Sequence, residues 1–383
     1  MRRNVNAFGK LNWGKVGRAV FALCATAMAL PAQTFTTLFS FDGTQGAQPA
    51  ATLLQATDGK LYGTTIWGGW TGANIGTVFN SGQSGTLTTL YSFCAQVDCP
   101  DGSQPSATLV QAPDGEFYGT TASGGATGQG TVFKITAAGT LTTLYSFCSR
   151  HGYACLDGAN PSGLIQAENG DLYGTTAVGG AHGVGTISKI TPDGALTSLY
   201  NFCSKPACAD GRNPYTGLTQ AVDGNFYGTT NGDANSDGTI FRFTPGGTLT
   251  TLHTFNGKDG AAPNALLQAT DGSLFGTTKG GGNTDNGTVF TISPNGALAT
   301  LHSFCAEDQA SCRDGRNPTG LMQATDGNFY GTAFAGGAEG YGTIFKITAA
   351  GTLTTLHSFC SQSGCPDGEN PAAGLVQGTD GDF

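Results

Sequence analysis

The sequence predicts an all-β protein, a β-propeller of four-stranded blades, and three observations carry this prediction. One unit of about 55 residues recurs along almost the whole chain. Each unit contains four short runs of β-type residues separated by turn signals, and no stretch has a helical spacing of apolar residues. The 383 residues include 62 glycines and only 11% charged residues, which fits many tight turns between short strands. A β-helix rung would be much shorter, and an immunoglobulin-like domain needs about 100 residues.

The first 32 residues differ from the repeats and are typical of a secretory signal. Basic residues precede the apolar run AVFALCATAMAL at 19–30, and small residues precede an expected cleavage after Ala32. The run has about 12 residues, whereas a membrane span needs about 20. An uncleaved anchor is the alternative, and Leu23 before Cys24 fits a lipoprotein cleavage box poorly. We expect a mature chain of residues 33–383, exported to the periplasm, the cell surface or the medium.

The net charge of the mature chain narrows the classes of partner that it is expected to bind. The leader removes five basic residues and no acidic ones, which leaves 12 basic against 26 acidic residues. Such a surface repels phosphate backbones and anionic lipid heads. We therefore expect no nucleic-acid partner and no membrane insertion after cleavage.

Within a unit, the four strands follow one another with distinct turn signals. In the second unit they are expected at 106–112, 116–121, 130–136 and 140–147. The Asp114-Gly115 pair between the first two suits a two-residue type I′ hairpin, which needs positive φ at both positions. Sequences such as AAG, PDG and PNG suit the turn between the third and fourth strands.

The segments at the two ends of the chain indicate where in the repeat each blade begins and ends. Six complete blades are expected at about 51–93, 106–147, 162–202, 216–255, 264–304 and 319–359. The segment 34–41 matches an outermost strand, and 373–383 matches an innermost strand and the turn after it. We expect these two segments to form an incomplete seventh blade that lacks its two middle strands. Further blades or an anchor beyond Phe383 are an open alternative.

The repeated pattern LVQAxDGxxYGTTxxGGxxxxGTVFKITxxGTLTTLYSF resembles the GloVer tandem repeat of secreted choice-of-anchor proteins. It is more distantly similar to NHL-type blades. The resemblance covers roughly residues 34–383, and the recurring YGTT…GG…GT[VI]F makes it specific. It implies a propeller fold and an exported location, and it implies no catalytic residue.

Ten cysteines form five local pairs, each after an outer-strand SF or NF and before an Asp-Gly turn. The pairs are Cys94 and Cys99, Cys148 and Cys155, Cys203 and Cys208, Cys305 and Cys312, and Cys360 and Cys365. In an exported protein such pairs predict disulfides. Zinc is the rival interpretation, but each loop offers two thiolates and no consistent histidine. We expect no metal and no cofactor.

The links from outer to next inner strand should emerge on the same end as the links between second and third strands. The cysteine loops and the glycine-rich loops then share one face, while the other face carries only tight turns. Binding and catalytic residues concentrate on loops, so the face with the cysteine loops is the candidate site.

The residues that recur in every unit are expected to be structural. An aspartate in each DGxxxP-like turn should cap that turn, with a calcium ring as the alternative. These aspartates are Asp42, Asp101, Asp157, Asp210, Asp259, Asp314 and Asp367. His253, His302 and His357 stand where other units have Phe39 or a tyrosine, so we expect packing residues with a polar tip.

Residues that depart from the repeat are the better candidates for ligand binding. Solvent-facing aromatic rings beside planar donors suit stacking on sugar rings or gripping a peptide. The candidates are Trp67, Trp70, Tyr153, Arg212, Tyr215, Arg316, Phe334 and Tyr341, with Arg150 and Arg313 nearby. Each aromatic can instead simply cover its loop.

Two function classes follow. The first is an exported binding scaffold for polysaccharide or a cell-surface ligand. The alternative is a hydrolase or lyase in which His151 and His182, with Asp157 or Glu168, transfer protons. No nucleophile elbow, phosphate loop or HExxH motif supports an enzyme, so we favour the scaffold.

Overall fold

The structure is a computed structural model that describes residues 34–69, 75–82, 85–148, 155–232, 237–307 and 311–383. The chain divides into two compact units, Met1–Thr34 and Phe35–Phe383. The expected signal segment, 1–32, lies outside the described residues. The unit Phe35–Phe383 contains every strand that the structure describes.

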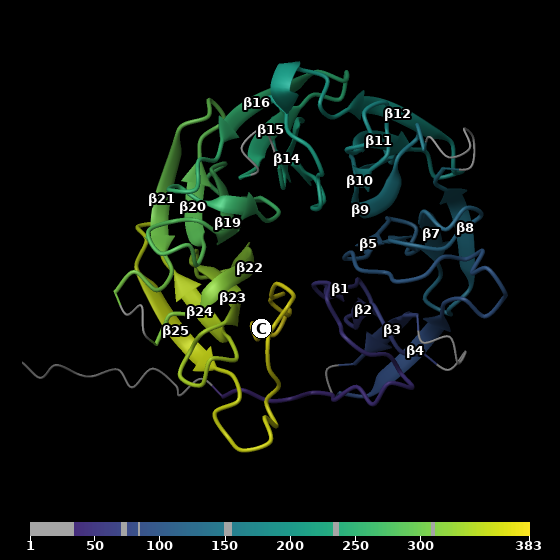
Figure 1. Ribbon diagram of the computed structural model, residues 1–383. Helices are drawn as coiled ribbons and strands as arrows, with labels where there is room; N and C mark the ends of the chain where they lie inside the picture. The colour runs from purple at the N-terminus through teal and green to yellow at the C-terminus, as the bar shows by residue number, and fades with distance from the viewer. Residues whose placement is uncertain (1–33, 70–74, 83–84, 149–154, 233–236, 308–310) are drawn as a thin grey trace, which may run out of the picture. The chain divides into compact units, whose positions relative to one another are not determined.

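This unit is a β-propeller with six antiparallel blades around a common axis (Figure 1). Blades 1 to 3 consist of β1 (Leu54–Gln55), β2 (Leu61–Thr65), β3 (Thr77–Ser81) and β4 (Leu87–Ser92); β5 (Val110–Gln111), β6 (Phe117–Thr121), β7 (Thr131–Ile135) and β8 (Leu141–Ser146); and β9 (Ala159–Gln166), β10 (Leu172–Val178), β11 (Thr186–Ile190) and β12 (Leu196–Asn201).

Blades 4 to 6 repeat this pattern. They consist of β13 (Thr219–Gln220), β14 (Phe226–Thr230), β15 (Thr239–Phe243) and β16 (Leu249–Thr254); β17 (Ala261–Pro263), β18 (Leu267–Gln268), β19 (Leu274–Gly280), β20 (Thr288–Ile292) and β21 (Leu298–Ser303); and β22 (Arg316–Gln323), β23 (Phe329–Ala335), β24 (Thr343–Ile347) and β25 (Leu353–Ser358). In blade 5 the inner strand is split into β17 and β18, which both pair with β19. A short 3₁₀ turn, η2 (Pro206–Cys208), is the one helical element among the described residues, and none there is long and apolar enough to cross a membrane.

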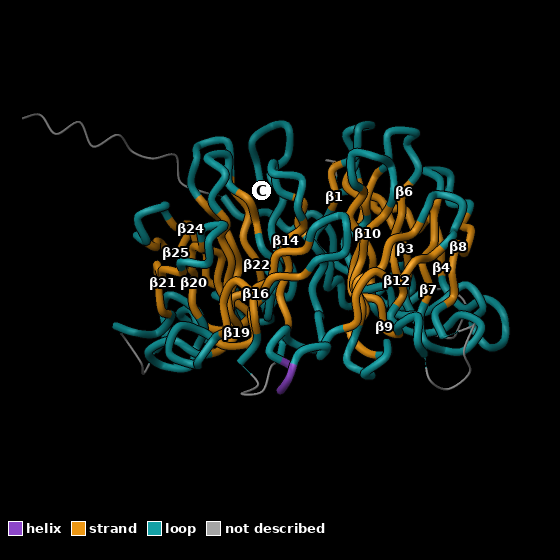
Figure 2. Tube along the Cα trace, turned by 90° about the horizontal axis from the view of Figure 1, so that it is seen from above, coloured by secondary structure: helices purple, strands orange, loops and turns teal. Residues whose placement is uncertain are grey.

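Strand register assigns the loops to two faces, as expected. In blade 1, Thr77 at the start of β3 pairs with Ser92 at the end of β4 and with Thr65 at the end of β2. Links from one blade to the next therefore lie beside the links between second and third strands. We call this end of the blades the cysteine-loop face, and the end that carries the turns within hairpins the hairpin-turn face (Figure 2).

The turns on the hairpin-turn face are not the type I′ turns that the Asp-Gly pairs predict. In blade 2, the Gly115 N–H donates to the Ala112 carbonyl and the Ala112 N–H donates to the Glu116 carbonyl. Gly115 has a φ of 87°, but Asp114 is not in the positive-φ region. The connection is therefore a three-residue loop, a type I turn followed by a left-handed glycine. The aspartate suits its place because its carboxylate accepts the Glu116 N–H at 3.0 Å.

In five of the six blades the second strand carries a glycine where the third strand's phenylalanine crosses it. A Cβ on Gly119 would lie 2.5 Å from the Phe133 ring. The same conflict recurs at the corresponding glycine of blades 1, 4, 5 and 6. The glycine thus makes room for the aromatic core of its own blade.

Five apolar clusters hold successive blades together. Between blades 1 and 2, Tyr62 and Phe93 of blade 1 pack with Phe117 and Phe133 of blade 2. Four further clusters repeat this arrangement from blade 2 through blade 6. Each blade therefore buries its apolar side chains largely against its neighbours.

The expected seventh blade is not formed as a sheet, because neither 35–41 nor 373–383 is a strand. Both segments nevertheless reach blades 6 and 1. The Gln377 side-chain carbonyl accepts the Thr325 N–H of blade 6 at 2.9 Å, and the side-chain carbonyl of Gln55 in blade 1 accepts the Thr379 N–H at 3.0 Å. The sequence holds six copies of the two middle strands, and all six already belong to blades.

The outer segment spans the same gap. Phe35 stacks on His357 of blade 6 with 4.4 Å between ring centroids, and Phe41 meets Phe79 of blade 1 edge-on at 5.2 Å. The N-terminal and C-terminal parts of the unit thus meet between blades 6 and 1 (Figure 1).

Candidate functional site

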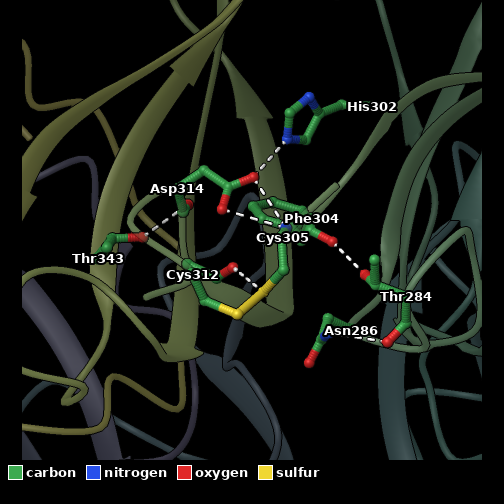
Figure 3. Close-up of a disulfide and its surroundings, with 9 residues drawn as sticks. Thr284, Asn286, His302, Phe304, Cys305, Cys312, Asp314 and Thr343 are labelled. Carbon is green, nitrogen blue, oxygen red and sulfur yellow. Dashed lines mark hydrogen bonds and ion pairs between the residues drawn. A yellow bond between two sulfur atoms is a disulfide. The ribbon is translucent and has the colours of Figure 1, made fainter. Parts of the chain in front are cut away.

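An aspartate clasp organises each link on the cysteine-loop face. The Asp314 carboxylate accepts the Cys305 N–H at 3.0 Å and lies 2.9 Å from His302 Nε2, both in or just after β21 of blade 5 (Figure 3). The Asp314 main-chain carbonyl accepts the hydroxyl of Thr343, which begins β24 of blade 6, at 3.4 Å. One residue therefore connects two blades.

The clasp recurs with a tyrosine or a histidine on the outer strand. Its pairs, 2.7–2.9 Å apart, are Tyr91–Asp101, Tyr145–Asp157, Tyr200–Asp210, His253–Asp259, His302–Asp314 and His357–Asp367. The three histidines pack edge-on against the phenylalanine two residues later, as the tyrosines do, so the prediction of polar-tipped packing residues is confirmed. Burial, with the adjacent Asp101 and its hydrogen bond, raises the pKa of Tyr91, and burial with Asp210 raises that of Tyr200.

The prediction that each aspartate caps its own turn is therefore wrong for six of the seven. Asp42 does cap its turn, because it accepts the Thr44 N–H at 2.9 Å. Asp42 does not stand at the clasp position, because in this link the main-chain carbonyl of Gln45 accepts the Thr77 hydroxyl at 3.0 Å, as that of Asp314 accepts the Thr343 hydroxyl. The first link therefore has Phe39 and Gln45 where the others have a tyrosine or histidine and an aspartate. In the other six links the ring's O–H or Nε2 draws the carboxylate back to the outer strand. No group of three or more metal-ligating side chains occurs in the described parts of the chain.

The cysteine loops and glycine loops are joined into one layer. The Gly125 N–H of blade 2 donates to the Cys99 carbonyl at 2.8 Å, and equivalent bonds reach Cys155 and Cys312. In the links after blades 1 to 5, the glycine of the Asp-Gly pair lies directly on the strands of the next blade: a Cβ on Gly102 would lie 2.3 Å from Thr121 Oγ1. Loop backbones thus rest on the sheet without intervening side chains.

All five predicted disulfides are formed, with Cα atoms 4.0–4.5 Å apart. All ten cysteines have positive φ, between 42° and 62°. Non-glycine residues adopt this left-handed region rarely and at a cost, so surrounding structure must hold them there. The disulfide and the clasp together supply that restraint.

The predicted aromatic residues are spread over several blades. Phe334 and Tyr341 of blade 6 are 43% and 41% exposed, and Tyr215 of blade 4 is 56% exposed. Trp67 of blade 1 is half-buried, and its backbone pairs with Ala47. Trp70, Arg150, His151 and Tyr153 lie outside the described residues.

Blade 6 brings three of the predicted residues to one end. Arg316 is exposed and pairs across the strands with Ala335, the residue after Phe334. The Asn370 side chain donates to the Phe334 carbonyl at 3.0 Å, and the Asn370 N–H donates to the Tyr341 carbonyl at 2.7 Å. Asn370 thus holds the segments of Phe334 and Tyr341 together. We call the end of blade 6 formed by Phe334, Tyr341 and Arg316 the rim.

Blades 4 and 5 continue the rim. Arg212 pairs with Gly232 at the position that Arg316 occupies in blade 6. Sequence reasoning missed Lys279, an exposed residue of β19 at the position of Phe334. Comparing the residue that follows GTT or GTA in each repeat would have found it.

The predicted acid–base pairing of His182 with Glu168 is not formed, and the pairings of His151 lie outside the described residues. His182 is exposed in the glycine loop of blade 3, but Glu168 lies in the turn between β9 and β10, on the opposite face. The other expected partner, Asp157, is buried and already accepts the Tyr145 hydroxyl and the Cys148 N–H. The repeat places these carboxylates for structural contacts.

A hollow of about 420 Å³ lies on the hairpin-turn face. It is lined by Thr270, Met322, Gln323, Ala324, Thr325, Leu375, Val376 and Gln377. These are the inner-strand ends and turns of blades 5 and 6 and the C-terminal segment. The lining repeats across the units, so this hollow carries no distinctive chemistry.

The repeated blades and the disulfides in the links make this chain a tandem-repeat β-propeller with disulfide-bonded links. The family model of the Gloeobacter/Verrucomicrobia repeat matches residues 24–157 and 151–313. The chain belongs to this family, which confirms the resemblance seen in the sequence. No curated protein matches the chain.

Three solved structures with a similar fold come from extracellular, periplasmic or surface proteins. One is the extracellular domain of a protein named as a hybrid two component system from B. thetaiotaomicron, with TM-score 0.55, 12% identity, and 86% of this chain and 36% of that one covered. Another is the periplasmic gluconolactonase PpgL of Pseudomonas aeruginosa, with TM-score 0.52, 16% identity and coverage of 86% and 87%.

A third is PorZ, a bacterial surface component of the type-IX secretion system of Porphyromonas gingivalis, with TM-score 0.51, 12% identity and coverage of 85% and 43%. The chain spans less than half the length of the first and third structures. At these identities the likeness concerns the fold alone.

Proposed function

We propose that this protein is an exported binding scaffold whose ligand site lies on the cysteine-loop face. The observation that carries the proposal is the contrast between the two faces. The hairpin-turn face repeats one three-residue turn from blade to blade. The cysteine-loop face combines loops of different length and side chains with a backbone layer fixed by clasps and disulfides. A specific site needs both varied side chains and rigid support.

The rim of blades 4 to 6 suits a polysaccharide, with a surface protein as the other candidate ligand. Tyr215, Phe334 and Tyr341 expose rings that can stack on sugar faces. Arg316 and Lys279 add hydrogen-bond donors beside them. For the enzymatic alternative, a hydrolase or lyase, the three His–Asp pairs of the clasps offer little support, because each pair holds a link between blades.

Export is part of the proposal. Five disulfides persist only in an oxidising compartment, and the first 32 residues have the pattern of a secretory signal. Periplasm, cell surface and medium all satisfy this condition.

The ligand proposal is tested with a glycan array followed by calorimetry. Each stacked ring contributes about 0.5–1.5 kcal/mol, so the Phe334→Ala, Tyr341→Ala double variant should bind a captured glycan roughly tenfold more weakly. Val222→Ala is the matched control, because Val222 is 90% exposed on the hairpin-turn face.

The Trp67→Ala, Trp70→Ala variant tests whether the site extends to blade 1. Unchanged affinity in both double variants would remove the site from this face. Turnover of a bound glycan that disappears in His151→Ala would favour the enzyme instead.

We also propose that the ring is laid out for seven blades, the seventh being incomplete. The C-terminal segment makes inner-strand contacts and 35–41 makes outer-strand contacts, both between blades 6 and 1. Appending the sequence of residues 118–136, the two middle strands of blade 2, directly after Phe383 should raise the melting temperature by several degrees. A lower or unchanged melting temperature would argue for a closed six-blade ring.

A further inference from the structure

On the hairpin-turn face, basic side chains of three blades are matched by carboxylates of the same blade. Lys134, Lys189 and Lys346 each stand in a third strand, and each Nζ lies 2.9–3.2 Å from a carboxylate oxygen. Each of these cations balances a negative charge beside it. The fold therefore accounts for their presence.

Two basic side chains of the cysteine-loop face have no such match. Lys279 lies near the end of β19 in blade 5, Arg316 begins β22 in blade 6, and both are exposed. Neither side chain forms an ion pair with any residue that the structure describes. The carboxylate of Asp285, in the adjacent glycine loop, accepts the Gly281 N–H at 2.7 Å. In a mature chain with more than twice as many acidic as basic residues, such cations call for an explanation.

The backbones of these two basic residues are held next to each other across a blade boundary. The side-chain amide of Asn317, the residue after Arg316, donates to the Lys279 carbonyl at 2.8 Å. The Asn317 N–H donates to the Asn286 carbonyl of blade 5 at 2.8 Å. Like charges at neighbouring positions repel each other, and an anion bound between them would remove that repulsion.

The fold itself does not require a basic residue at either position. Arg316 and Lys279 occupy positions of the inner and second strands that hold small residues in blades 2 and 3. Those small residues are buried or half-buried: Ser103, Ala122, Ala159 and Ala177. Blade 4 has Arg212 at the position of Arg316, and a Cβ on Gly232 would lie 3.0 Å from its Nε. Blades 4, 5 and 6 thus each contribute one basic residue, whereas blades 2 and 3 contribute none.

An exposed aromatic ring lies in the strand next to Arg316. Phe334 is 43% exposed and takes in blade 6 the position that Lys279 takes in blade 5. Arg316 pairs with Ala335, the residue after Phe334. A neutral sugar could stack on the ring but would offer no charge to the two cations. A sugar residue with a carboxylate presents both an apolar face and an anion, and the planar guanidinium of arginine matches a carboxylate in geometry.

We propose that the rim binds a polysaccharide with carboxylated sugar residues, one sugar ring stacking on Phe334 and its carboxylate lying between Lys279 and Arg316. The inference rests on the proposed function above and names the class of its ligand. Carboxylates that stand singly on a neutral chain suit this protein best, because its excess of acidic residues repels a dense polyanion. Screening confines that repulsion to about 8 Å at physiological ionic strength, so the two adjacent cations decide the binding of a single carboxylate.

The test uses the mature protein with glucuronoxylan and polygalacturonate, each also in a form whose carboxyl groups are reduced to alcohols. Calorimetry should show at least roughly tenfold tighter binding of an acidic polymer than of its reduced form, because hydrogen bonds to charged groups are the stronger ones. The Lys279→Gln, Arg316→Gln variant should lose this difference and bind the reduced form as the wild type does. Free glucuronate, but not glucose, should compete with the acidic polymer.

The matched control is Lys60→Gln with Lys205→Gln, which removes the same charge from two exposed lysines outside the rim. This variant should keep the preference for the acidic polymer. All four substituted residues are exposed, so both double variants should keep the wild-type melting temperature. An equal loss of binding in the control would assign the effect to overall charge and overturn the inference.

The remaining outcomes separate this inference from the proposed function. Equal binding of acidic and reduced polymers, weakened by Phe334→Ala with Tyr341→Ala, would overturn the carboxylate and leave the glycan-binding scaffold standing. Tighter binding of dextran sulfate than of either acidic polymer, lost in Lys279→Gln with Arg316→Gln, would assign the cations to a sulfate and also overturn it. If none of the polymers binds, both this inference and the proposed glycan ligand fail.

Discussion

At the residue scale, the clasp couples two positions about ten residues apart. An outer-strand ring with a polar atom accompanies an aspartate that reaches back to it, whereas Phe39 accompanies Gln45 at the aspartate's position. The three tyrosine clasps and three histidine clasps have the same geometry. The polar atom, and not the kind of ring, is what the aspartate requires.

This requirement predicts that two substitutions in one clasp change the free energy of unfolding by different amounts. Asp314→Ala leaves His302 and the Cys305 N–H without their acceptor, so the free energy of unfolding should fall by about 1–3 kcal/mol. His302→Tyr reproduces the clasp of blades 1 to 3 and should change it by less than about 1 kcal/mol. Urea denaturation measures both. Equal losses in the two variants would show that packing, and not the polar contact, is what matters there.

Tyrosines near the hairpin turns make the fold sensitive to alkali. Burial, with the hydrogen bond to Asp223 and its charge, raises the pKa of Tyr227 to about 12. The unfolded chain releases this proton near pH 10, so between pH 10 and 12 the unfolded state binds fewer protons and each rise in pH lowers stability. Below pH 10 both states keep the proton and the effect is absent.

The expected result is a denaturation midpoint that falls as pH rises above 10. Tyr227→Phe removes the titrating group and should make that fall shallower. An identical pH dependence in Tyr227→Phe and the wild type would exclude this residue as a source. The remainder comes from the other tyrosines whose pKa values burial and a neighbouring aspartate raise, namely Tyr62, Tyr91, Tyr118, Tyr200 and Tyr330.

At the scale of the loop, two links show what the disulfides add. The link after blade 4 has no cysteines, yet Asp259 still clasps His253 at 2.8 Å and the Gly282 N–H still donates to the Gly257 carbonyl. The clasp and the docking onto the glycine loop therefore form without a disulfide. The bridge restrains the additional residues that the longer links contain.

Removing one disulfide should consequently have a local effect. For a closed loop of this size the chain-entropy estimate is about 2 kcal/mol, so Cys305→Ser with Cys312→Ser should lower the free energy of unfolding by no more than that. Hydrogen exchange should accelerate in the link between blades 5 and 6 and stay unchanged in blades 1 to 3. Accelerated exchange throughout the ring would show that the bridge holds the fold and not merely its loop.

At the scale of the whole molecule, the sequence predicts the blades well because one pattern is repeated. Alternating turn signals and β-type runs give the order of strands, and the lone outer-strand and inner-strand segments indicate how the ends lie. The sequence misses the turn type, since Asp114 can adopt either sign of φ and Gly115 alone takes the left-handed conformation. Propensity at one position does not decide the hydrogen bonds of the whole turn.

The candidate site is predicted less well, for a geometric reason. Glu168 and His182 are close in sequence, but a strand separates them and carries them to opposite faces. The clasp joins residues whose types vary together, Tyr or His with Asp, and a single sequence shows such coupling only through the exception at Phe39. Side chains in register across blades, such as Arg212 and Arg316, become evident only once the inner strands are aligned in space.

Each link contacts both the blade before it and the blade after it, and this affects how such a protein can gain or lose repeats. The links differ in two respects. Phe39 and Gln45 replace the ring and the aspartate of the clasp in the first link, and the links after Phe39 and His253 lack the cysteine pair that His302 and Asp314 enclose. A genetic crossover inside a link would join the first half of one kind to the second half of another, leaving an unpaired thiol or an aspartate without its ring. Crossovers in the turns of the hairpin-turn face transmit each set intact. Those turns are therefore the natural boundaries for duplicating, deleting or transplanting a repeat. Such a boundary lies within a blade, whereas the boundary between two sheets lies in a link.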